Sequence, residues 1–143
     1  MVKKQDNNLF TKDGDILVNS TGEGTVGRAV YITDYYSGYF YDSHMLLLRL
    51  NKSVAEPRFV QLFLNSNKGQ KLLLEKLGAQ ATKQVELGVN NLESIKIPLP
   101  PLETQRQIVE KLDKQMQALE GVRLLKEEAK RRIDEILAGV WGE

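Results

Sequence analysis

The stretch IKIPLPPLETQRQIV, residues 95–109, decides the fold that the sequence predicts. An apolar strand at residues 92–97 should end at Pro98 and Pro100, because proline has no backbone N–H to donate to a strand ladder. Pro101 suits the first turn of a helix, where its missing N–H costs nothing. The junction therefore separates a part that contains strands from a helical part.

The helix that begins at this junction is predicted to be long. Its apolar residues keep helical spacing as far as Leu137, and a glycine stop follows at residues 138–139. We expect an α+β chain with two parts: a small head of short strands and a helix at residues 1–100, and one long, coiled-coil-like helix at residues 101–143.

An apolar stripe along this helix predicts that it packs against a partner. The stripe follows the 3-4-3 spacing of a coiled-coil seam and then slips by three residues near Gly121, with Lys126 at an inner position. The simplest way to cover the stripe is a two-fold dimer of antiparallel helices. The predicted contact residues are Val109, Leu112, Met116, Leu119, Val122, Ala129, Ile133 and Ile136.

Within the head, short apolar runs predict strands and one longer periodic segment predicts a helix. The helix should run from Pro57 to about Leu77, unless the polar stretch at residues 65–70 splits it into two, and Gly78 suits its end. The predicted strands are residues 16–19, 28–32, 44–50, 85–89 and 92–97.

The composition excludes several classes of site and of protein. The chain has no cysteine, and its one histidine, His44, cannot by itself assemble a catalytic or zinc site. We expect no cofactor, no metal and no enzymatic activity. The longest apolar run, residues 45–48, is too short to cross a bilayer, and no signal peptide is visible, so we expect a soluble cytoplasmic protein.

The junction also carries a family resemblance. IPLPPLETQRQIVEKLD, residues 97–113, resembles the end of a target recognition domain running into the conserved helix of the specificity subunit of type I restriction–modification enzymes. DGDILVNSTG, residues 13–22, looks like the glycine-bearing strand and turn of those domains, and residues 87–99 look like their closing strands. Family domains have a further portion before the DGDILV strand, so we expect this chain to be the C-terminal part of such a subunit.

The resemblance implies a function and a set of partners. The chain would be a non-catalytic DNA-recognition and assembly module that binds double-stranded DNA together with the methyltransferase (modification) subunit and the restriction subunit. The alternative is a structural or dimerisation fragment with no independent DNA binding. The head carries 12 basic and 10 acidic residues up to residue 102, and the whole chain has a net charge of +1, so DNA binding by the isolated chain should be weak.

Two loops are the candidates for DNA contact. The first, residues 19–28, contains Ser20, Thr21 and Arg28 among glycines; hydroxyls suit phosphates, and arginine commonly reads guanine. Its GxGxxG pattern, residues 22–27, is not read as a dinucleotide site because a strand follows it rather than a helix. An ordinary hairpin connection is the competing interpretation.

The second candidate loop is residues 79–84, where Gln80, Thr82 and Lys83 offer an amide, a hydroxyl and a cation. The residues alone fit an ordinary solvated loop equally well, and the resemblance puts this loop on the DNA side. A third feature is the aromatic loop at residues 33–43, with rings at Tyr35, Tyr36, Tyr39, Phe40 and Tyr41. Stacked bases could use such rings, but we expect them to cap a small β core.

Overall fold

A computed structural model describes residues 10–77 and 86–142 of the 143-residue chain. The chain divides into two compact units, Met1–Arg106 and Gln107–Glu143, which we call the head and the helical unit and treat separately. The dividing point falls one turn inside the long helix, so the first turn of that helix belongs to the head. The predicted boundary at residue 100 stays a prediction.

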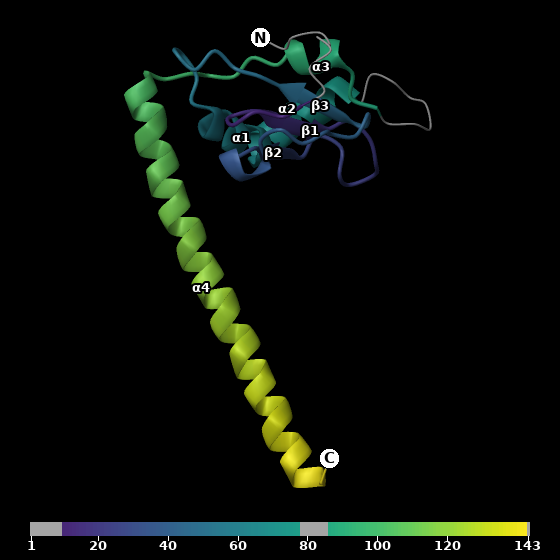
Figure 1. The fold of residues 1–143 in the computed structure, drawn as a ribbon, viewed down its shortest axis with the longest axis vertical. Helices are drawn as coiled ribbons and strands as arrows, with labels where there is room; N and C mark the ends of the chain where they lie inside the picture. The colour runs from purple at the N-terminus through teal and green to yellow at the C-terminus, as the bar shows by residue number, and fades with distance from the viewer. Residues whose placement is uncertain (1–9, 78–85, 143) are drawn as a thin grey trace. The chain divides into compact units, whose positions relative to one another are not determined.

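The head is an α+β unit, as predicted, built on a three-stranded antiparallel sheet with the order β2-β1-β3 (Figure 1). β1 is Ile16–Asn19, β2 is Ala29–Tyr31 and β3 is Met45–Leu48. All three lie within strands predicted from the sequence.

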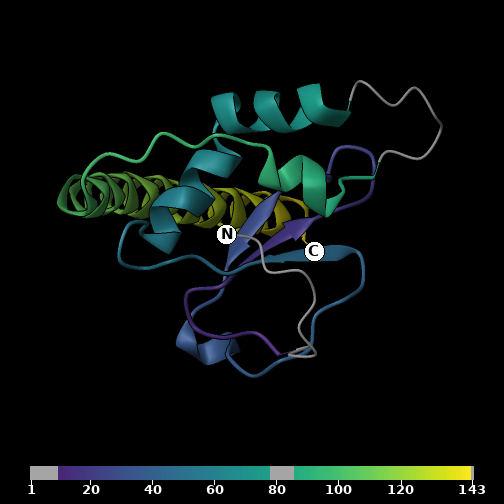
Figure 2. The ribbon, with the colours of Figure 1, turned by 90° about the horizontal axis from the view of Figure 1, so that it is seen from above.

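Two helices pack on one face of the sheet, α1 (Pro57–Asn65) and α2 (Asn67–Leu77) (Figure 2). The polar stretch therefore splits the predicted helix in two. Ser66 lies at the break, where its hydroxyl donates to the carbonyl of Phe63 at 2.6 Å and accepts from the N–H of Gly69 at 3.1 Å. That second bond satisfies one of the free amides at the start of α2.

The core lies between the sheet and these helices. Successive residues of a strand point to opposite faces, and the inward set of β1 is Ile16 and Val18, both fully buried. α1 and α2 contribute Val60, Leu64 and Leu73. The outward set places Leu17 between Val30 and Leu47 of the neighbouring strands.

The two strands predicted after residue 84 are wrong. Val89–Glu93 forms a short helix, α3, behind Gly88, and residues 95–100 have no regular structure. The alternation that suggested a strand has another cause: Ile95 and Ile97 pack against the core while the residues between and after them are exposed. Gly78 and the loop at residues 79–84 lie outside the described residues.

The long helix α4 runs unbroken from Leu102 to Trp141. Its continuity through Gly121 was predicted, but the predicted end near Gly139 is wrong, since the helix continues past that glycine. No described helix is long and apolar enough to span a membrane.

Candidate nucleic-acid interface

The loop between β1 and β2 is an exposed turn whose ends are pinned. Gly22, Gly24 and Gly27 have φ values of 95°, 73° and 83°, which residues other than glycine rarely adopt. The N–H of Gly27 donates to the carbonyl of Asn19 at 2.7 Å, and buried Val26 anchors the return of the chain. The loop therefore has a defined shape and presents residues 22–25 to solvent.

Ser20 does not face a ligand, which corrects the sequence-based assignment. It is 3% exposed, and its hydroxyl donates to the carbonyl of His44 at 2.6 Å. Its own carbonyl accepts from the N–H of Leu87 at 2.7 Å. Ser20 continues the inward set of Ile16 and Val18 and ties β1 to residues 44 and 87.

Thr21 lies on the opposite side of the chain and is half-buried. It pairs with Glu86 in an isolated β-bridge, which joins the first candidate loop to the chain just after the second. Gln80, Thr82 and Lys83 themselves lie outside the described residues.

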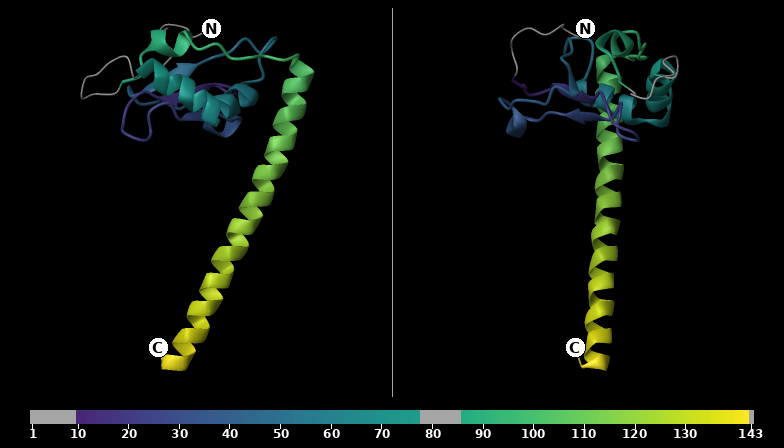
Figure 3. Two further views of the ribbon diagram at one scale, coloured as in Figure 1. Left: turned by 180° about the vertical axis from the view of Figure 1, so that it is seen from behind. Right: turned by 90° about the vertical axis from the view of Figure 1, so that its right-hand side faces the viewer.

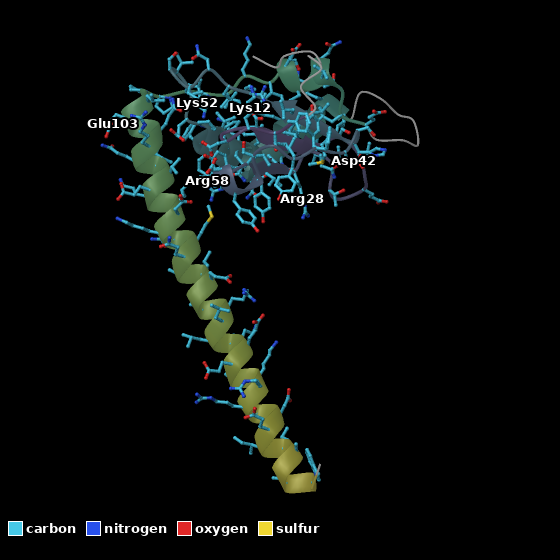
Figure 4. The ribbon with its side chains drawn as sticks, viewed as in Figure 1. Lys12, Arg28, Asp42, Lys52, Arg58 and Glu103 are labelled. Carbon is cyan, nitrogen blue, oxygen red and sulfur yellow. The ribbon has the colours of Figure 1, made fainter. Side chains whose placement is uncertain are left out.

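Arg28 begins the return strand, and its side chain is exposed (Figure 4). Across residues 10–77 and 86–142 we find neither a hydrogen bond nor an ion pair of its guanidinium. Its backbone is fixed by bonds from its N–H to Thr25 and from the N–H of Asn19 to its carbonyl. A fixed backbone and an exposed guanidinium suit contact with a phosphate or a purine edge.

Two side-chain amides of α1 and α2, which were not predicted from the sequence, form hydrogen bonds to the backbone at the end of this loop. Gln70 of α2 donates to the carbonyl of Gly27 at 3.0 Å, and Asn65 of α1 bonds both the N–H and the carbonyl of Ala29, each at 2.8 Å. Asn65 is exposed and Gln70 is half-buried, and the only advance signal was their place in the polar stretch that interrupts the predicted helix. They attach the Arg28 region to the helical layer.

The charged side chains near β3 form structural contacts. Buried Asp15 accepts two bonds from Arg49, at 2.8 and 2.6 Å, and this contact raises the pKa of Arg49. Asp42 accepts from the backbone N–H and the ring of His44, each at 2.7 Å, and these bonds lower the pKa of Asp42. His44 is exposed, and no group of three possible metal ligands occurs among the residues that the structure describes.

In the helical unit the predicted stripe is largely open to solvent. Leu119 and Ile136 are among its most exposed members, whereas Val109 is half-buried. Ion pairs three or four residues apart, such as Glu128–Arg132 and Arg123–Glu127, run along other faces. Because α4 is unbroken, a second row in seven-residue steps also runs along it from Leu112, namely Leu119, Lys126, Ile133 and Val140, and the register slip near Gly121 stays a prediction.

One buried side chain of α4 was not predicted. Gln105 is fully buried in the head, where its Oε1 accepts from the N–H of Glu56 at 2.8 Å. Its Nε2 donates to the carbonyls of Val54 at 3.0 Å and Pro100 at 2.7 Å. The signal was its place one heptad before Leu112, on the stripe, where a polar residue stands out.

The family model for the type I restriction modification DNA specificity domain matches residues 1–130. A protein of Methanocaldococcus jannaschii named as the type I restriction enzyme MjaX specificity subunit is 33% identical over 96 residues, 66% of this chain and 22% of its own length. A protein of Haemophilus influenzae named as the specificity subunit S.HindORF215P is 32% identical over 106 residues, 73% of this chain and 25% of its own.

Solved structures agree. The HsdS subunit of Thermoanaerobacter tengcongensis superposes with a TM-score of 0.67 at 26% identity, over 85% of this chain and 31% of that one. A chain from a study of complex assembly and conformational transition of the type I R-M system gives 0.65 with the same identity and coverage. The resemblance stated from the sequence is confirmed, and the chain belongs to the family of type I restriction modification DNA specificity domains.

Proposed function

We propose that this chain is a non-catalytic module that recognises a DNA sequence and helps to hold a type I restriction–modification assembly together. Family membership supports this class of function. The chain spans 22% and 25% of the length of its two named relatives. The partners proposed for it are double-stranded DNA, the modification and restriction subunits, and a second copy of the chain, all in the cytoplasm.

The exposed guanidinium of Arg28 is the observation that carries the DNA half of the proposal. It stands at the end of a glycine loop of fixed shape, and that loop bonds through Thr21 to the chain that follows Gln80, Thr82 and Lys83. These five residues form the proposed DNA-facing set. Ser20 is removed from it because its hydroxyl is buried and bonded.

The electrostatics favour contact within an assembly over binding by the chain alone. Glu23 in the first loop and Glu86 beside it are exposed carboxylates on the same part of the head. The net charge of the chain is only +1. Affinity for phosphates grows with the number of cations that neutralise them, so other subunits must supply most of the backbone contacts.

A complex reconstituted with the modification subunit tests the DNA half. Arg28→Ala and Lys83→Ala should each weaken binding of the target duplex, by about 1–3 kcal/mol where a base contact is lost. Lys52→Ala is the matched control, since it also removes one exposed cation and lies on a different side of the head (Figure 4). Unchanged affinity and sequence preference in both variants would show that these loops are structural turns.

The second candidate function is a dimerisation fragment that binds no DNA by itself. Two observations together favour it: the chain is nearly neutral, and α4 carries an exposed apolar stripe. Salt-dependent retention on DNA, measured with and without the modification subunit, separates the two functions. The fragment hypothesis predicts no retention in either case and an intact dimer in both.

A further inference from the structure

The loop between β2 and β3 holds three tyrosine rings out in solvent. It contains a short 3-10 helix, η1 (Asp34–Tyr36), and lies on the side of the sheet away from α1 and α2 (Figures 2 and 3). Tyr35, Tyr36 and Tyr39 are 78%, 55% and 61% exposed, and we call them the tyrosine patch. The expectation that these rings cap the core is therefore wrong.

The patch is rigid because its backbone is bonded to a buried residue. The hydroxyl of Thr11 donates to the carbonyl of Tyr36 at 2.6 Å and accepts from the N–H of Tyr39 at 3.2 Å. The N–H of Thr11 donates to the carbonyl of Tyr39 at 2.9 Å, and Gly38 makes the turn with a φ of 86°. The rings are thus presented on a preformed surface, which lowers the entropic cost of binding.

The rings also hold one another. Tyr35 and Tyr36 meet edge to face with centroids 4.8 Å apart, and Tyr36 and Tyr39 are 6.5 Å apart. On the same side of the sheet, Val30 is more than half exposed, opposite Leu17 in the strand register. Exposed tyrosines that cluster in one loop have the composition of an interface core rather than of ordinary surface.

The local charge selects the kind of partner. Residues 33–43 carry two carboxylates, Asp34 and Asp42, and neither lysine nor arginine. The bonds from His44 lower the pKa of Asp42, so its carboxylate stays ionised at neutral pH. Such a loop repels phosphates, whereas tyrosine faces and carboxylates both attract lysine and arginine side chains.

We propose that the tyrosine patch docks a protein surface in which arginine or lysine side chains stand among apolar ones, contributed by the modification subunit. The inference rests on the proposed function, because it assigns a second surface of the head to the same assembly. DNA would contact the loops near Arg28, and the protein partner would contact the loop at residues 33–43.

The test measures the affinity of the purified full chain for the modification subunit by calorimetry. Tyr36→Ser with Tyr39→Ser removes two rings and leaves the backbone bonds to Thr11 in place. We expect this pair to weaken binding about tenfold or more, as loss of interface anchors does. Leu74→Ser is the matched control, since it removes an exposed apolar side chain from α2 on the other side of the sheet.

A charge variant keeps the proposal testable if the double variant does not fold. Asp34→Lys changes an exposed side chain and should weaken binding, more strongly at low salt than at high salt. Binding that stays at the wild-type level in the tyrosine and charge variants overturns this inference and leaves the proposed function standing. Failure of the wild-type chain to bind the modification subunit contradicts both.

Parallel titrations with duplex DNA test whether the tyrosine patch binds DNA instead of protein. At low salt, where the weak binding of DNA by the chain alone is strongest, the tyrosine variants should bind DNA as the wild type does. If they lose affinity for DNA while binding the modification subunit normally, the patch is a nucleic-acid surface and the inference is wrong.

Discussion

The head and the helical unit differ in the exposure of their apolar side chains. In the head, Ile16, Leu64 and Leu73 are almost completely buried between the sheet and two helices. In the helical unit, every large apolar side chain from Leu112 to Trp141 is exposed. The head therefore has an apolar core of its own, whereas the described part of α4 beyond Leu112 is held by its backbone hydrogen bonds and exposed ion pairs. We expect a partner to cover the exposed apolar stripe of the helical unit.

A single methyl group in the head should have the largest effect. At Gly69 an added Cβ would lie 2.1 Å from the carbonyl oxygen of Phe63 and 2.7 Å from that of Leu64, both backbone atoms. Gly69→Ala must therefore push α1 and α2 apart and should cost about 3 kcal/mol or more. The free energy of unfolding from urea titration measures it. A cost below 1 kcal/mol would mean that the two helices meet differently.

Removal of the Gln105 side chain should have the next largest effect. Gln105→Ala leaves the N–H of Glu56 and two carbonyls without the partner they have in the structure, at a cost of about 2 kcal/mol. Gln107→Ala, two residues on and exposed, is the control and should be neutral. Equal stability of the two variants would contradict the assigned role of Gln105.

The same glycine-to-alanine change should be mildly favourable in the helical unit. Nothing lies within 4 Å of a Cβ added at Gly121. Gly121→Ala should therefore raise helix stability by about 0.5–1 kcal/mol, the usual difference in helix propensity. Circular dichroism at 222 nm during heating measures the change. A loss of helicity would indicate that a partner packs closely against this position.

Local sequence patterns predicted much of the secondary structure of the head. Its other features depend on contacts between segments that are distant in the sequence. β1 and β2 followed from alternation and glycine turns around residues 16–31. Ile95 and Ile97 do alternate with exposed residues, but they do so because they contact the core, and they form no strand. The direction of Ser20 was available in advance, because it shares the inward face of Ile16 and Val18.

The tyrosine patch and Gln105 needed the structure. Thr11 holds the aromatic loop through hydrogen bonds to its backbone, and no sequence pattern indicates that a threonine some 25 residues away replaces core packing as the support. Gln105 looks like a surface residue of a helix until the segment at residues 54–56 is placed against it. The apolar stripe of α4, in contrast, could be predicted from the spacing of its apolar residues in the sequence.

The mass of the chain in solution tests directly whether the stripe on α4 is an interface while the head folds by itself. Leu112→Lys with Leu119→Lys charges the stripe, while Gln107→Lys with Gln117→Lys adds the same charge to the opposite face of the helix. By light scattering, the stripe variant should have the 16.2 kDa mass of one chain, and the wild type and the control should have twice that mass. All three should keep the same unfolding transition of the head. A stripe variant that retains the wild-type mass would show that the interface lies elsewhere.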